Sequence, residues 1–199
     1  MEPRSSVFIT SSESYICVQG VHQLKRSGAF AQTTSVSHLV HFFRRTLEAL
    51  LVAKRSANDA ALVSALGANK GFVSFVGAGG KKTTMYALAR AHPGRVLLSS
   101  TSHMYQYRED AVDKVVTLGP GASIPNVDRH RVVALAGETD TPKRVGGIPA
   151  TQIRQAYDNL GFDVCLIKCD GARARWIKSP GPAEPLIPAF ADTVIPVVS

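Results

Sequence analysis

The sequence predicts an α/β fold in which a mostly parallel sheet is flanked by helices, and three observations support this class. Apolar runs rich in Val, Leu and Ile recur between residues 57 and 199. Segments of helical period stand between several of these runs, and such alternation is typical of parallel sheets. A turn rich in glycine and lysine, residues 77–84, joins one apolar run to the helical segment that follows it.

The predicted elements follow one another in a regular order. Ser56 is a candidate N-cap for a short helix that runs through Leu66 and ends at Gly67. A second helix begins near Thr83 and stops at the turn formed by residues 92–94. A third helix is marked by apolar positions between residues 153 and 160 and ends at Gly161. The predicted strands cover residues 72–76, 95–99, 114–118, 131–135, 163–169 and 193–198.

The turn between the first strand and the second helix has the composition of a phosphate-binding loop. Glycines let backbone N–H groups point toward an anion, and a helix N-terminus adds partial positive charge. A lysine can reach the β- and γ-phosphates, and a hydroxyl in the first helical turn can bind Mg²⁺. We therefore predict a P-loop NTPase-like domain that binds Mg²⁺ with ATP or GTP through Gly77, Ala78, Gly79, Gly80, Lys81, Lys82, Thr83 and Thr84.

The loop departs from the standard pattern G-x-x-x-x-G-K-[ST] at two positions. Phe75 stands where the first glycine is expected, and Lys82 stands where a hydroxyl is expected. Either Thr83 serves the metal instead, or Lys82 adds positive charge and the metal matters less. The alternative interpretation of the same residues is a glycine-rich turn that binds no ligand.

Further polar clusters follow the predicted strands, where ligands collect in parallel sheets. Asp170 follows the strand 163–169 and is a predicted Mg²⁺ ligand, as Thr83 is; we assign catalytic roles to Asp170 and Lys81. Each cluster also has a structural explanation, such as a surface histidine, a turn or a proline-rich loop. The remaining predicted ligand-binding residues are Ser102, His103, Arg173 and Lys178.

The composition divides the chain near residue 56. Residues 1–56 are predicted to form a poorly ordered N-terminal extension, and residues 57–199 the P-loop nucleotide-binding domain. Within the extension, the spacing of apolar and basic residues predicts a basic amphipathic helix over about 39–55. Such a helix can bind an anionic membrane or a partner, but packing against its own domain is the interpretation that we favour.

The charge pattern and the apolar runs limit the classes of partner that we expect. The net charge is +8, but basic runs are no longer than two residues and aromatic residues do not interleave with them, so nucleic acid is not an expected partner. No apolar run approaches 18 residues, so a membrane is not expected either.

The three cysteines, Cys17, Cys165 and Cys169, lack the spacing of a metal site. Cys165 and Cys169 are expected to be reduced core thiols on one face of a strand. A cytoplasmic location follows as the prediction.

Taken together, the glycine–lysine loop and the polar clusters that follow the predicted strands resemble the family of selenium-dependent molybdenum hydroxylase accessory proteins. The resemblance covers roughly residues 60–199 and implies a phosphate-loop nucleotide-binding fold. It also implies a role in maturing molybdenum hydroxylases that depend on labile selenium, with the hydroxylase or its maturation machinery as a protein partner. The residues that carry it are Gly77 to Lys81, His103, Asp170 to Arg173, Lys178, Pro180 and Glu184 to Pro188.

Three departures from the family pattern leave other functions open. The family usually has a threonine after the loop lysine, where this chain has Lys82, and a glutamate two residues before the aspartate, where this chain has Lys168. Lys168 is expected to share a strand face with Asp170 and to pair with it. Family members are also expected to continue beyond Ser199. These departures favour a non-catalytic, degenerate module that docks on a metalloenzyme or a cofactor-insertion partner, whereas the short loop permits ligase-type activation of a carboxylate.

Overall fold

The computed structural model describes residues 55–119, 121–171 and 184–198. These residues all belong to one compact unit, Thr46–Ser199. The predicted amphipathic helix at 39–55 lies outside the described residues except for its last residue, and the predicted ligand-binding residues Arg173 and Lys178 lie outside them as well. Within the described part of the chain, no helix combines the length and the apolar character needed to cross a membrane.

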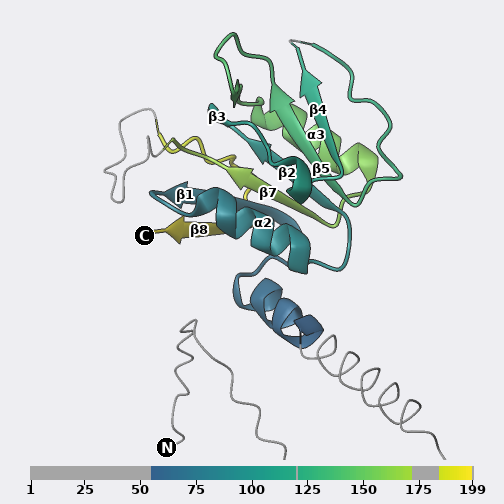
Figure 1. The fold of residues 1–199 in the computed structure, drawn as a ribbon, viewed down its shortest axis with the longest axis vertical. Coiled ribbons are helices and arrows are strands. Elements are labelled where there is room, and N and C mark those ends of the chain that lie inside the picture. Colours follow the sequence, from purple (N-terminus) through teal and green to yellow (C-terminus); the bar gives the residue numbers. More distant parts are fainter. Residues whose placement is uncertain (1–54, 120, 172–183, 199) are drawn as a thin grey trace, which may run out of the picture. The chain divides into compact units, whose positions relative to one another are not determined.

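Six parallel strands form the central sheet, in the spatial order β4-β5-β2-β7-β1-β8 (Figure 1). The predicted α/β class with a mostly parallel sheet is therefore confirmed. The largest difference from a predicted strand boundary lies at the end of β5, predicted at Leu135 and observed at Gly137. The strands are β1 (Gly71–Gly77), β2 (Val96–Ser100), β4 (Lys114–Leu118), β5 (Val132–Gly137), β7 (Val164–Lys168) and β8 (Thr193–Val197).

Helices pack on both faces of this sheet. Helix α2 (Lys81–Ala91) contributes Met85 and Leu88 to one core cluster, and a helix at residues 55–65 contributes Val63 to the same cluster. Helix α3 (Ala150–Leu160) contributes Ile153 and Ala156 to a second cluster. Because both faces are covered, every residue of β2, β5 and β7 is buried, as expected for strands of a parallel sheet.

Two predicted helix starts are wrong. Residues 55–65 are helical, so Ser56 lies inside the helix and cannot be its N-cap, because Arg55 before it already has a helical backbone. Helix α2 begins at Lys81 rather than near Thr83, because Gly80 already occupies the N-cap position with a left-handed backbone. The predicted helix ends at Gly67 and Gly161 are confirmed, since both glycines have φ near +60°.

Three short elements were not predicted. Strands β3 (Met104–Tyr105) and β6 (Arg144–Val145) pair antiparallel as a separate two-stranded sheet, and a 3₁₀ helix, η1, covers Glu109–Ala111. Elements of two or three residues are too short to show a period in the sequence. They nevertheless position the loops that follow β2 and β5 at the carboxyl edge of the main sheet.

Aspartates at the amino edge of the sheet hold the strand starts together. Each precedes one strand and accepts a hydrogen bond from a backbone N–H at the start of a neighbouring strand. The pairs are Asp113 with Val132 (2.8 Å), Asp163 with Arg95 (2.7 Å) and Asp192 with Phe72 (2.8 Å). These hydrogen bonds stabilise the amino edge of the sheet. Ligands of parallel sheets ordinarily bind at the opposite, carboxyl edge.

Candidate functional site

The glycine loop lies at the carboxyl edge of the sheet, between β1 and α2. Gly77, Gly79 and Gly80 have φ values of 98°, 74° and 61°, which favour glycine because a Cβ is strained there. A Cβ at Gly77 would also clash with the carbonyl oxygen of Val197, the oxygen that accepts a hydrogen bond from Ala78 N–H at 2.9 Å. The glycines are therefore required by the backbone path of the loop and by its contact with β8.

Lys81 and Asp170 form a buried ion pair at this edge. Lys81 Nζ lies 2.9 Å from Asp170 Oδ1, and the two side chains are 4% and 5% exposed. The second carboxylate oxygen, Oδ2, accepts a hydrogen bond from Gly77 N–H at 2.8 Å, while Lys81 Nζ also donates to Gly77 O. The two residues predicted to be catalytic, 89 positions apart in the chain, meet because β7 lies beside β1 in parallel register.

Lys168 adds a second buried ammonium group to the same edge. Its side chain is 7% exposed, and Nζ donates to Ser102 Oγ at 2.8 Å and to His103 O at 3.4 Å. Burial, and then the nearby Lys81 charge, lower the pKa of Lys168 to about 8, whereas Asp170 and Glu184 act in the opposite direction. Asp170 therefore acts on Lys168 electrostatically, as the shared strand face predicted, but the hydrogen bonds of Lys168 go to the end of β2.

Sequence reasoning did not include Lys168 among the site residues. The available signal was a lysine inside the apolar run 164–169, at a position where a buried strand ordinarily has an apolar residue. The same contact brings Ser102 into the site, because its hydroxyl accepts the Lys168 hydrogen bond. The His103 side chain is exposed, and this residue takes part through its carbonyl oxygen.

The Lys82 side chain makes hydrogen bonds beside the glycine loop. Its Nζ donates to Tyr105 O at 3.0 Å and to Gln106 O at 2.7 Å, and it lies 5.6 Å from the centre of the Tyr86 ring. Burial, followed by the charge of Arg108, lowers the Lys82 pKa. These contacts tie the start of α2 to the segment around β3, and contact of Lys82 with phosphate stays a prediction.

The oxygen atoms around the loop do not fit a magnesium site in the arrangement that the structure shows. Mg²⁺ is usually held by one or two carboxylates together with substrate phosphates and water. Here both Asp170 oxygens are engaged by Lys81 and Gly77, and Thr84 Oγ1 donates to Gly80 O at 3.1 Å. Thr83 is exposed. In the described ranges, His, Cys, Asp and Glu side chains form no group of three that could hold a metal ion.

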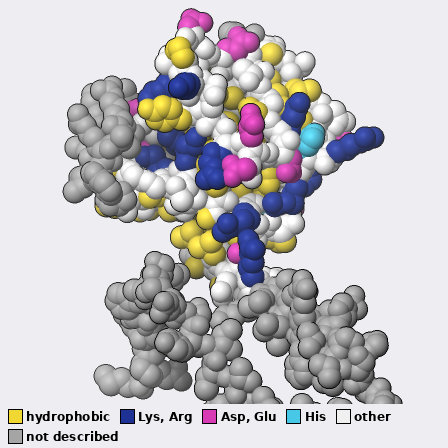
Figure 2. Space-filling model, in the orientation of Figure 1, with side chains coloured by type: hydrophobic (Ala, Val, Ile, Leu, Met, Phe, Trp, Pro, Cys, Tyr) yellow, Lys and Arg dark blue, Asp and Glu magenta, His cyan; other side chains and the backbone are white. Residues whose placement is uncertain are grey.

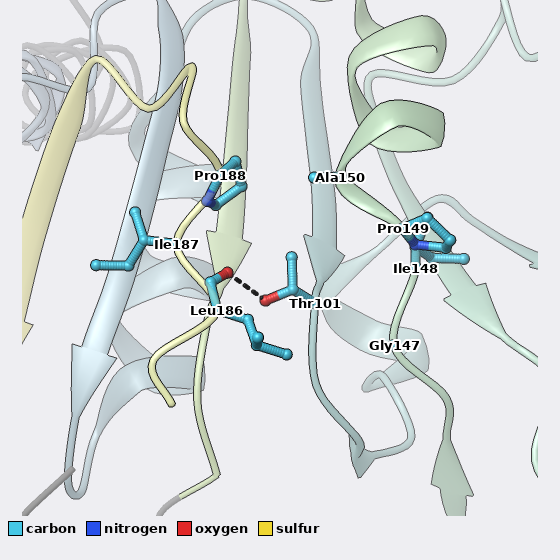
Figure 3. Close-up of a pocket in the computed structure, with 8 residues that line it drawn as sticks. All are labelled: Thr101, Gly147, Ile148, Pro149, Ala150, Leu186, Ile187 and Pro188. Atoms are coloured by element: carbon cyan, nitrogen blue, oxygen red, sulfur yellow. Dashed lines mark hydrogen bonds between the residues drawn. The ribbon is translucent and has the colours of Figure 1, made fainter. Parts of the chain in front are cut away.

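Two cavities extend the carboxyl edge toward the start of α3. One has a volume of about 460 Å³ and lies beside Thr101, whose hydroxyl donates to Leu186 O at 2.9 Å (Figure 3). The other, of about 620 Å³, lies at the ends of β4 and β5. Both are lined by the segment Gly147, Ile148 and Pro149, which sequence analysis did not single out. The first is otherwise lined by Thr101, Ala150, Leu186, Ile187 and Pro188.

The surface carries charges of both signs. Figure 2 shows Lys and Arg side chains interspersed with Asp and Glu on the face in view. A polynucleotide site usually shows a basic patch or stripe. The expectation that nucleic acid is not a partner stays a prediction.

The described loop, Asp170 and β8 all lie in the part of the chain that matches a known family. The sequence model of the YqeC protein family matches residues 73–199. The chain is also 31% identical, over 152 residues, to the protein of Escherichia coli (strain K12) named "Uncharacterized protein YqeC", and this match covers 73% of the chain and 59% of that relative. The chain therefore spans about three fifths of the relative's length. No solved structure matches the chain. Because the family match extends over more than half of its residues, this chain belongs to the YqeC protein family.

Proposed function

We propose that the loop at residues 77–84 binds the phosphate groups of ATP or GTP. The observation that carries this proposal is the buried ion pair between Lys81 and Asp170, which joins the glycine loop to the end of the neighbouring strand. Two charged side chains are costly to bury, and a buried ion pair is often no more stabilising than well-packed apolar residues of similar volume. Its place at the carboxyl edge of a parallel sheet, next to a helix N-terminus, favours a role in ligand binding.

The loop offers several donors to a phosphate group. The N-cap of α2 is Gly80, which has no capping side chain, and the first turn of α2 contains no acidic residue. An anion is favoured at such a helix start by the N–H groups and by the helix dipole. Lys81 would donate its third N–H to a phosphate oxygen and would keep its contact with Asp170. Any phosphoryl transfer would then depend on positioning and on charge neutralisation.

The physiological role that we propose is that of an accessory protein in the maturation of selenium-dependent molybdenum hydroxylases. Nucleotide binding would control a transfer step between this protein and the hydroxylase or its maturation machinery. The support for this role is the resemblance carried by the glycine loop, by Asp170 to Arg173 and by Glu184 to Pro188. Membership of the YqeC family is compatible with that resemblance.

A non-catalytic docking module is the second candidate function. The observation that favours it is the engagement of Asp170 by Lys81 and by Gly77 N–H, which occupies the carboxylate expected to hold a catalytic metal. Such a module would bind nucleotide without releasing phosphate. Release of phosphate only when an acceptor carboxylate is added would instead indicate ligase-type chemistry.

Thermal unfolding of the full chain, with and without Mg-ATP or Mg-GTP, tests the phosphate site. A ligand at about a hundred times its Kd stabilises by about 2.7 kcal/mol, and each kcal/mol raises the midpoint by roughly 2–4 °C for a chain of this size. We expect a shift that Lys81→Met abolishes. The matched control is Lys114→Met, which removes an exposed lysine from β4. A folded wild-type protein that shows no shift with either nucleotide would overturn the proposal. If a shift is seen, an assay of phosphate release decides between an enzyme and a docking module.

A further inference from the structure

Two buried ammonium groups at the phosphate loop each retain a donor for a ligand. An ammonium group has three N–H donors. Lys168 Nζ donates to Ser102 Oγ and to His103 O, and Lys81 Nζ contacts Asp170 Oδ1 and Gly77 O. Within the described ranges, two donors of each group therefore have acceptors, and one donor of each remains for an additional acceptor such as a phosphate oxygen.

Lys168 is positioned next to the proposed phosphate site. It ends β7, which lies between β1 and β2, and it is in register with Phe75 on one side and with Ser100 on the other. The end of β1 leads directly into the glycine loop. Lys81 lies close enough for its charge to disfavour the charged form of Lys168. Lys168 and the loop lysine thus belong to one electrostatic site.

The charges of this site do not favour a divalent cation. Lys81 and Lys168 are positive, while Asp170 and Glu184, which both act electrostatically on Lys168, are negative. Among the described residues, these four formal charges cancel, so together they offer no excess negative charge to Mg²⁺. A cation at Asp170 would also have to displace the Lys81 ammonium from Oδ1 at 2.9 Å. Phosphate oxygens, in contrast, can accept hydrogen bonds from both ammonium groups without displacing either carboxylate.

From this arrangement we infer that Lys168 binds the nucleotide phosphates directly and takes the role that a divalent cation has in magnesium-dependent sites. Nucleotide binding by this chain then does not require Mg²⁺. The inference depends on the proposed function of the loop and identifies the form of the ligand: a nucleoside triphosphate without a protein-held metal. Lys168 is a ligand-binding residue in this arrangement, and Ser102 positions its ammonium group.

Isothermal titration calorimetry with ATP and GTP, in Mg²⁺ or in EDTA, tests this inference on the full wild-type chain. We expect the two affinities to agree within about threefold, because no metal bridges protein and phosphate. Lys168→Gln should bind about tenfold more weakly in either buffer, since it loses one charge-assisted hydrogen bond. Lys168→Glu should bind only in Mg²⁺, because it places a second carboxylate beside Asp170. Lys114→Gln, the control at an exposed lysine of β4, should leave both affinities unchanged.

The outcomes separate this inference from the proposed function. Wild-type binding that is lost in EDTA would overturn the inference and leave the phosphate loop in place. Unchanged affinity of folded Lys168→Gln in EDTA would also overturn it, because a phosphate contact by Lys168 requires a loss. Absence of binding to the folded wild-type protein in both buffers would overturn the proposed function itself. The wild-type comparison decides the metal requirement even if a Lys168 variant does not fold.

Discussion

The buried ion pair between Lys81 and Asp170 predicts a coupled effect of two substitutions on stability. Lys81→Met removes the ammonium group and leaves a carboxylate whose side chain is 5% exposed. Asp170→Asn removes the negative charge but keeps an oxygen that can accept the Gly77 N–H bond, now 2.8 Å long. The double variant removes both charges, so neither is left buried without its partner.

The expected magnitudes follow from the burial of the pair. Removal of one partner of a buried ion pair costs about 3–5 kcal/mol. We expect about 3 kcal/mol for Lys81→Met, at the low end, because Lys168 still places a positive charge near Asp170. Asp170→Asn should cost about 2 kcal/mol, since one hydrogen bond survives. The double variant should cost about 3 kcal/mol rather than the sum, a coupling of about 2 kcal/mol, which is within the range for residues in contact.

Urea unfolding of the four proteins, followed by circular dichroism, measures this coupling without any ligand. A cost of about 3 kcal/mol corresponds to a midpoint lower by roughly 6–12 °C in a thermal scan. The same measurements provide the ligand-free baseline for the nucleotide experiments. Costs that add to within about 0.5 kcal/mol would refute the reasoning, because they would mean that the two charges do not depend on each other.

Three further predictions concern the loop, the amino edge and the buried lysine. Gly77→Ala should destabilise by more than about 2 kcal/mol in urea unfolding, because the new Cβ meets Val197 O at a left-handed φ of 98°. Asp192→Ala should cost about 1–3 kcal/mol in the same assay, because it leaves the Phe72 N–H, now 2.8 Å from the carboxylate, without this acceptor. The free energy of unfolding of the wild type should rise relative to that of Lys168→Met between pH 8 and 10. In that range the folded protein has lost the Lys168 proton and the unfolded chain retains it, because burial lowers the folded pKa to about 8 from 10.5.

Each of these predictions has its own control. Gly121→Ala is the comparison for the loop glycine, since Gly121 has a left-handed φ of 71° but, chain neighbours aside, no heavy atom of the described residues lies within 4 Å of an added Cβ. Asp128→Ala is the control for Asp192→Ala, because both aspartates are exposed. For Lys168, a stability difference that stays constant from pH 7 to 10 would contradict the lowered pKa. Equal costs for the two glycine variants would contradict the role assigned to the Val197 carbonyl.

The class of fold could be predicted from the sequence because local patterns specify each element. The apolar run 114–118 was predicted with the observed boundaries, and Gly67 and Gly161 were recognised as helix ends. The boundaries that failed, at Ser56 and at the start of α2, depend on which residue leaves the helical backbone first. That choice is made by packing and by backbone conformation and is weakly encoded in residue type.

The chemical content of the candidate site was also visible in the chain, but its arrangement was not. The glycine–lysine turn and Asp170 could be identified as candidate site residues because glycine, lysine and aspartate have few roles in such positions. Their contact depends on strand order: β7 lies next to β1, although eight elements, from α2 to α3, separate the two strands in the sequence. Lys168 was expected to pair with Asp170, and its hydrogen bonds to Ser102 and His103 require the position of β2 on the other side of β7.

The sequence by itself thus determined an α/β domain with a parallel sheet and a glycine–lysine turn after its first strand, because these features depend on neighbours along the chain. Only the tertiary structure decided which charges meet. Strand order and register brought Lys81 to Asp170 and Lys168 to Ser102, buried all four side chains, and placed Gly77 against β8. These contacts join residues far apart in the sequence, and their energies depend on burial and distance, which no local pattern specifies.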